Sequence, residues 1–284
     1  MKKYYSPTKP YSKVRRPHLI FKTLFFLSKP FKRPKVIREA PIPSEPVIFI
    51  ANHANDYGPM AMLFSAERSF RAWSSANMLS LKTAPDQIMK TIFPNAEKLF
   101  PLCRVLSYLM APVMCGIFKA SGVIPVYRDI RVKTTFAKTI ETLKEGLDVV
   151  IFPDSLIPDP DNEYMDTIQK GAFKTFGICR KHIGKAPYAV PVYCCKALDI
   201  VCVGTPIAFD TDLEDSEAEE KLIKQVGNEI KRLALSLPTH KVTHYAVMPR
   251  NIEKIKKYLT YNEEKIYNEL LKNQETENND ILKN

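Results

Sequence analysis

Short apolar runs that end in polar residues alternate with longer amphipathic segments over most of this chain. Runs rich in Val, Ile and Phe predict strands at 47–51, 71–76, 122–126, 148–152, 189–195 and 200–203. Apolar residues at helical spacing predict helices at 60–67, 130–145, 167–182 and 214–236. Strands that alternate with helices of this length form βαβ units. The sequence therefore predicts an α/β fold with a mostly parallel central sheet flanked by helices.

The longest apolar stretch covers residues 99–118. Pro101, Arg104 and Pro112 argue against a simple transmembrane helix. We expect a pair of helices here, either packed in the core or lying at an interface where they could wall an acyl-chain pocket. Packing in the core is the stronger interpretation.

The formal charge of +11 on the 284 residues is unevenly placed. Residues 1–40 hold 12 of the 42 Lys and Arg but one of the 31 Asp and Glu, so the other 244 residues hold 30 of each sign. A strongly basic N-terminal segment of this kind indicates an acidic partner and says little about the fold. We therefore divide the chain into a basic leader (1–40), an α/β domain (41–250) and a C-terminal helix with a polar tail (251–284).

Within the leader, Ile20, Leu24 and Leu27 fall on one helical face, and Lys22 and Lys29 share another. The apolar part is far shorter than the roughly 20 residues that cross a bilayer. A basic amphipathic segment of this kind is typical of a membrane interface. Two alternatives remain open, namely a helix docked on the protein's own core and a nucleic-acid-binding arm. The arm would require polar residues in place of Phe and Leu.

The six cysteines lie mostly in apolar runs, and none forms a C-x-x-C pair. This pattern does not fit a zinc site, and it favours reduced, buried thiols in a cytosolic protein. His240 and His244 have the spacing of a helical metal pair, but Pro238 and β-like neighbours predict a surface loop and strand instead. The acidic residues between 155 and 163 predict a solvated loop. We expect no metal.

Three predicted strands end in polar residues that suit one chemistry. His53 follows the first strand with Asp56 nearby, Arg128 follows another, and Asp154 and Ser155 follow a third. Ligands of open α/β sheets bind at the carboxyl ends of the strands. A histidine beside a carboxylate can act as a general base on a hydroxyl, and an arginine can hold a phosphate. A single histidine is more often structural, so the combination carries the prediction.

These residues occur in an order that resembles the glycerolipid acyltransferase superfamily, the glycerol-3-phosphate and lysophosphatidic acid acyltransferases. That family carries Asn-His with an aspartate five residues after the histidine, then Gly-x-Ile-x-Val-x-Arg, Phe-Pro-Glu-Gly and Val-Pro-Val segments. The resemblance covers roughly residues 45–210. The matching segments here are Asn52-His53, residues 122–128, residues 151–154 and residues 190–192, with Lys170-Gly171-Ala172 and residues 204–207 as weaker matches.

The resemblance implies that His53 deprotonates the acceptor hydroxyl, which then attacks an acyl thioester. It implies that Arg128 holds the acceptor's phosphate. Further contacts with the substrate would come from Asn55, Pro153, Asp154 and Ser155. The donor would be acyl-CoA or acyl carrier protein, and the acceptor a lysophospholipid or glycerol phosphate. No metal, other cofactor or nucleic acid is implied. The protein would act in phospholipid biosynthesis, in the cytoplasm and peripherally on the inner face of the cell membrane.

The chain departs from the family pattern at three positions. Gly58 stands where the family has its aspartate, and the nearest carboxylate is that of Asp56, three residues after His53. Residues at this spacing can meet in a helical turn, so Asp56 is expected to orient the histidine. Asp154 and Ser155 replace the usual Glu and Gly. An alternative function is therefore a weakly active or inactive, acyltransferase-like protein that binds lipid at the membrane surface.

Overall fold

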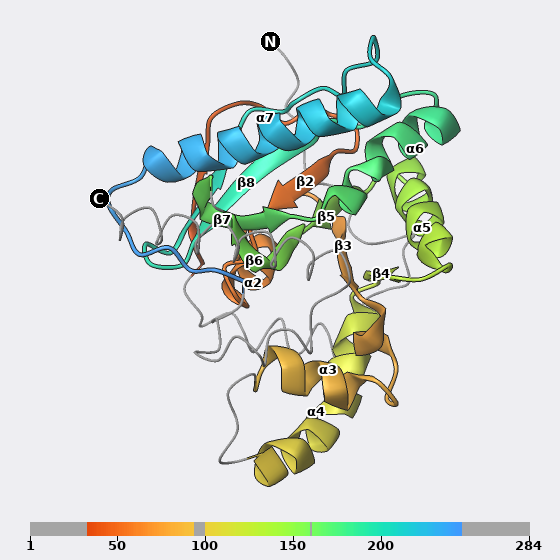
Figure 1. Ribbon diagram of the computed structural model, residues 1–284, viewed down its shortest axis with the longest axis vertical. Helices are drawn as coiled ribbons and strands as arrows, with labels where there is room; N and C mark the ends of the chain where they lie inside the picture. The colour runs from red at the N-terminus through yellow and green to blue at the C-terminus, as the bar shows by residue number, and fades with distance from the viewer. Residues whose placement is uncertain (1–32, 94–99, 160, 246–284) are drawn as a thin grey trace, which may run out of the picture.

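The computed structural model describes residues 33–93, 100–159 and 161–245, and within them a seven-stranded sheet forms the centre of the molecule (Figure 1). The strand order is β1-β9-β8-β2-β5-β3-β4, and every neighbouring pair is parallel except β8 and β9. The predicted α/β fold with a mostly parallel sheet flanked by helices is confirmed. The strands are β1 (Lys35–Arg38), β2 (Ile48–Ala51), β3 (Phe70–Ser75), β4 (Ile124–Val126), β5 (Asp148–Ile151), β8 (Ala189–Cys195) and β9 (Ile200–Val203).

The central strands are buried on both faces, which explains why their sequences are continuous apolar runs. Alternate residues of β2 enter two different cores: Ile48 and Ile50 lie in one, and Phe49 and Ala51 in the other. The first core is covered by α5 (Val132–Lys144), α6 (Lys174–Ile183) and α7 (Asp215–Leu235), and the second by α2 (Tyr57–Ser65).

Gly146 ends α5 as the sequence predicts. Its φ is +81°, and its N–H donates to the carbonyl of Leu143 while the N–H of Leu147 donates to Thr142. This is the left-handed helix end that favours glycine.

A separate helical unit is inserted between β3 and β4. It consists of η1 (Ala76–Leu79), α3 (Ala84–Thr91) and α4 (Phe100–Ala120), and it stands apart from the helices that cover the sheet (Figure 1). Its own small core contains Met78, Ile88 and Cys115. The prediction of two helices for 99–118 was wrong, because one helix continues through Pro112.

Two other segments differ from the prediction. The expected loop after residue 154 is an antiparallel hairpin, β6 (Asp154–Asp159) and β7 (Asn162–Ile168). The helix expected from residue 167 therefore begins only at Lys174, after η2 (Lys170–Ala172). The hairpin is held by tertiary contacts, since Met165 is buried and the side chain of Asn162 donates to the carbonyl of Gly227 in α7.

The leader boundary also changes. Residues Lys35–Arg38, assigned to the leader from their charge, form edge strand β1 and pair with β9. Basic side chains are common on edge strands because they discourage pairing with another chain. The α/β body therefore begins by Lys35. The amphipathic segment of the leader and the C-terminal helix predicted from 261 lie outside the described residues.

All six cysteines are buried and free, as the sequence predicts.

Candidate active site at the carboxyl edge of the sheet

The end of β2 is fixed to both neighbouring strands. The side-chain amide of Asn52 donates to the carbonyl of Cys194 in β8 at 3.2 Å and accepts from the N–H of the same residue at 2.6 Å. On the other side, the backbone N–H of His53 donates to Oδ2 of Asp154, which follows β5. Asn52 and Asp154 are both buried. These two side chains therefore set the position of the turn that carries His53.

The turn itself is unusually tight. Ala54 and Asn55 have φ of 45° and 57°, in the left-handed region that non-glycine residues rarely adopt. The N–H of Gly58 donates to the carbonyl of His53 at 2.9 Å. A Cβ at Gly58 would lie 2.5 Å from the carbonyl oxygen of His53 and 2.6 Å from that of Asn52. No side chain fits there, so the family's aspartate cannot occupy this position in this backbone.

The imidazole of His53 is oriented by a carbonyl. Its Nδ1 is hydrogen-bonded to the backbone oxygen of Asn55. A carbonyl can only accept, so Nδ1 carries the proton and the neutral ring keeps its lone pair on Nε2. Burial lowers the pKa of His53 below its usual 6.5, against the raising effects of the Asn55 carbonyl and of the Asp56 charge. His53 is therefore neutral at pH 7, as a general base must be.

Asp56 does not have the position that sequence reasoning gave it. It is exposed at the N-terminus of α2, and Nδ1 of His53 is hydrogen-bonded to Asn55 instead. Asp56 acts on the ring through its charge, which raises the pKa of His53.

A second carboxylate lies next to Asp154. Asp166 on β7 accepts from Nδ1 of His244 at 2.9 Å and from the N–H of Tyr245 at 2.7 Å. Asp154 and Asp166 are 3% and 4% exposed. Burial, and then the charge of Asp166, raise the pKa of Asp154 well above its usual 3.8, although the bond from the His53 N–H opposes them. Among the residues that the structure describes, Oδ1 of Asp154 has no hydrogen-bond partner.

The segment 243–245 covers this edge of the sheet. The ring of Tyr245 packs on that of His53 with the centroids 4.0 Å apart, and Phe152 lies 5.2 Å from the same ring. A small pocket next to it is lined by Asn52, Ala54, Asp154, Tyr164, Met165, Asp166, Thr243 and His244. The expected surface loop at 240–244 is therefore part of the site. No sequence pattern predicts the contact of this segment with Asp166, because the two lie far apart along the chain.

The remaining predicted residues divide into two groups. Asn55 is partly exposed and Arg128 is exposed, so both can meet a substrate. Pro153, Asp154 and Ser155 are buried, and the Asp154 carboxylate supports the backbone of His53. Direct contact of these three with an acceptor, as expected from the sequence, would require the edge to open.

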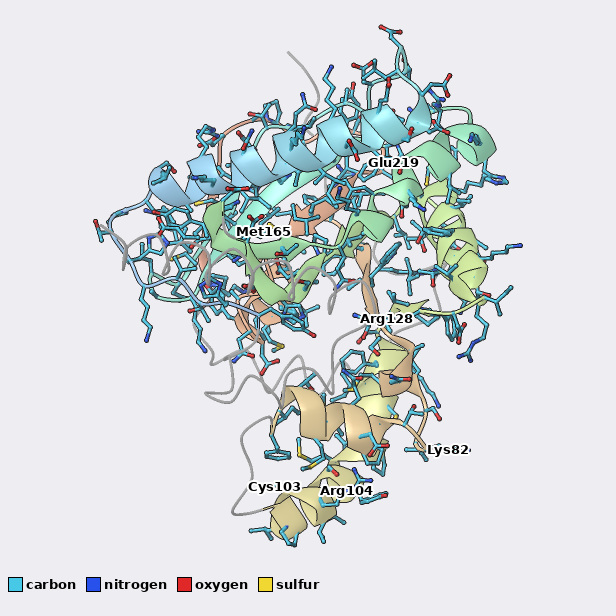
Figure 2. All side chains as sticks on the ribbon, in the orientation of Figure 1. Lys82, Cys103, Arg104, Arg128, Met165 and Glu219 are labelled. Atoms are coloured by element: carbon cyan, nitrogen blue, oxygen red, sulfur yellow. The ribbon has the colours of Figure 1, made fainter. Side chains whose placement is uncertain are left out.

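Arg128 follows β4, three strands away from β2 in the sheet. The pairing registers of β2, β5, β3 and β4 can be extended past the ends of the strands. They then bring Asp154 and Tyr127 level with His53, so Arg128 lies at the same edge of the sheet. Three strand spacings are roughly 14 Å, which the two side chains must bridge together with a substrate. Figure 2 shows Arg128 where the sheet meets the unit of α3 and α4.

Within residues 33–93, 100–159 and 161–245, no group of three or more His, Cys, Asp or Glu could hold a metal ion.

No protein-family model matches this chain, and no curated protein matches it. The resemblance to glycerolipid acyltransferases therefore depends on the sequence motifs alone.

We predict that the pKa of His53 lies below the usual histidine value of 6.5 and that the pKa of His244 lies above it. Burial keeps the pKa of His53 below it, and the hydrogen bond to Asp166 keeps that of His244 above it. The raised pKa means that His244 stabilises the segment 243–245 fully below pH 6.5 and loses this effect as the pH rises through its own pKa. Histidine ring resonances followed by NMR measure both values. A His244 pKa that stays raised in Asp166→Asn would contradict the assignment.

We predict that Gly58→Ala lowers the free energy of unfolding by about 1–3 kcal/mol, because the new Cβ must displace two backbone carbonyls. Gly171→Ala is the matched control, since a Cβ there meets nothing within 4 Å. Urea unfolding of both variants measures the difference. Equal stability of the two would show that the turn adapts easily.

Proposed function

We propose that this protein is an O-acyltransferase that moves a fatty acyl group from acyl-CoA or acyl carrier protein to a hydroxyl of a lysophospholipid or glycerol phosphate. The observation that carries the proposal is the state of His53. Its Nδ1 is hydrogen-bonded to the Asn55 carbonyl, burial lowers its pKa, and the ring lies at the carboxyl edge of a mostly parallel sheet, where such folds bind ligands.

In the proposed reaction, Nε2 of His53 takes the proton of the acceptor hydroxyl as its oxygen attacks the thioester carbonyl. The carbon–sulfur bond then breaks, and the thiolate leaves with the proton from the imidazolium. The Asn55 carbonyl accepts from Nδ1 in both protonation states, so it holds the ring orientation and stabilises the imidazolium. A neutral carbonyl does this less strongly than the carboxylate of a catalytic triad.

Arg128 is the proposed anchor for the phosphate of the acceptor. It is exposed at the same edge as His53, one residue past the level of the histidine, and a guanidinium can donate two parallel hydrogen bonds to a phosphate. The separation of roughly 14 Å between the strands favours an acceptor with several bonds between the phosphate and the reacting hydroxyl.

A second candidate function is lipid binding without turnover. Two observations favour lipid binding without turnover. The ring of Tyr245 packs on that of His53 and narrows the approach of a substrate to the imidazole. The Asp154 carboxylate supports the His53 backbone and so is not directed at a substrate. In either function we place the protein at the cytoplasmic face of the membrane.

We predict that His53→Ala lowers the rate of acyl transfer on the order of 10²–10⁴-fold, the usual contribution of a general base. His182→Ala is the matched control, because His182 is exposed at the end of α6 and precedes the amino end of β8. A radiolabelled acyl-transfer assay over several donors and acceptors measures the rates. Asp56→Asn should cost no more than about fivefold, since an exposed charge contributes at most about 1 kcal/mol.

Turnover that survives in His53→Ala would refute this mechanism. A wild-type protein that binds lysophospholipid but shows no turnover with any donor would favour the second function.

We predict that Arg128→Gln raises KM for phosphate-bearing acceptors by about tenfold, the loss of a hydrogen bond to a charged group. With monoacylglycerol, which has no phosphate, KM should not change. Arg131→Gln is the control, because Arg131 is exposed nearby and paired with Asp129. Equal effects on both kinds of acceptor would argue against a phosphate contact.

A further inference from the structure

Helix α4 has two apolar sides, and only one of them is packed against the described part of the chain. Cys103, Ser107, Ala111 and Cys115, four residues apart, are buried on the side toward α3 and η1. The opposite side consists of large apolar residues that are 41–67% exposed. We call it the outer face of α4, and it is formed by Leu102, Val105, Leu106, Leu109 and Val113.

Exposed apolar residues are concentrated in this unit. Eight of the eleven exposed large hydrophobic residues in the described part of the chain lie between Leu81 and Val113. Single exposed apolar residues are common on proteins, but a contiguous apolar patch marks an interaction site. The outer face of α4 is such a patch.

The composition of α4 fits a lipid environment. The segment Pro101–Ala120 is long and apolar enough to cross a bilayer. Core helices of soluble proteins also pass this test, but they are mostly buried, whereas only 22% of the most apolar window of this segment is buried. Crossing does not fit the connections of the helix, because α3 packs along it and only a few residues separate Ala120 from Ile124, which pairs with Trp73 in the sheet. A helix in this position can lie in the plane of the interface.

The charge of the unit is complementary to anionic headgroups. The only charged residues of α4 are Arg104 and Lys119; Arg104 is paired with Asp86 of α3, whereas Lys119 is exposed. The whole unit, residues 76–121, holds five basic and two acidic residues. Figure 2 shows Arg104 and Lys82 on this outlying unit.

We propose that the outer face of α4 docks the protein on the interface of an anionic phospholipid membrane. Five apolar side chains enter the boundary between headgroups and acyl chains, and the exposed Lys82 and Lys119 contact the phosphates. The unit continues directly from β3 at the carboxyl edge of the sheet, so docking brings the edge that carries His53 toward the lipid (Figure 1). This binding does not require catalysis, so its test is independent of the proposed acyl transfer.

The test is flotation of the full chain with phosphatidylcholine vesicles, with and without phosphatidylglycerol. The double variant Leu106→Gln/Leu109→Gln should bind about tenfold more weakly or worse, because each side chain loses the transfer of its apolar surface into lipid. The matched control Ile130→Gln/Leu235→Gln removes two side chains that are 85% and 60% exposed elsewhere, and it should bind as the wild type does. Circular dichroism checks that both variants are folded.

The charged residues give a second readout. Lys82→Gln/Lys119→Gln should lower the affinity for vesicles with phosphatidylglycerol by about fivefold for each charge and leave binding to phosphatidylcholine alone unchanged.

Three results would overturn the proposal. The double variant could bind vesicles as tightly as the wild type does. Binding could depend only on the leader, in which case Arg15→Gln/Arg16→Gln/Lys22→Gln abolishes it while the α4 variant has no effect. Finally, the double variant could convert a dimer to a monomer in analytical ultracentrifugation without changing vesicle binding, which would identify a second copy of the chain as the occupant.

Discussion

The hydrogen bond from the backbone N–H of His53 to the buried carboxylate of Asp154 is the contact on which the candidate site depends. It joins the first strand-end motif to the third, although the two residues are about a hundred positions apart. Together with the bonds of Asn52 to Cys194, it fixes the end of β2 between β5 and β8. The imidazole can then be oriented by a neighbouring carbonyl, since these bonds hold the backbone that presents both groups.

This arrangement distributes the usual parts of a catalytic triad differently. In a triad, one carboxylate both orients the histidine and stabilises its positive charge. Here the Asn55 carbonyl orients the ring. The two buried carboxylates accept from backbone N–H groups instead, Asp154 from His53 and Asp166 from Tyr245. Burial lowers the pKa of the histidine, and in the proposed reaction the positive charge on the ring would receive weaker support. A slow enzyme for a reactive thioester, or a binding protein, is consistent with this balance.

Much of the fold could be predicted because the central strands are buried on both faces and therefore apolar throughout. The β6–β7 hairpin was missed because its charges and prolines are typical of a loop, and Met165 and Asn162 fix it only through contacts with the rest of the fold. β1 was missed because its basic residues were assigned to the leader. In the candidate site, the sequence singled out His53 and Asp154, which the structure joins by a hydrogen bond, but the Asp154 carboxylate supports the His53 backbone instead of facing a substrate. The contacts of Asp166 with His244 and Tyr245 could not be found, because residues 78 and 79 positions apart meet only in the folded chain.

The glycine at position 58 has a consequence for how this site can evolve. A Cβ at this position has no room, so a single substitution by aspartate meets a steric barrier in this backbone, although it would restore the motif in the sequence. The surrounding turn, which includes the left-handed residues Ala54 and Asn55, would have to take another path to make room. An aspartate at this position therefore depends on a change of the backbone around it.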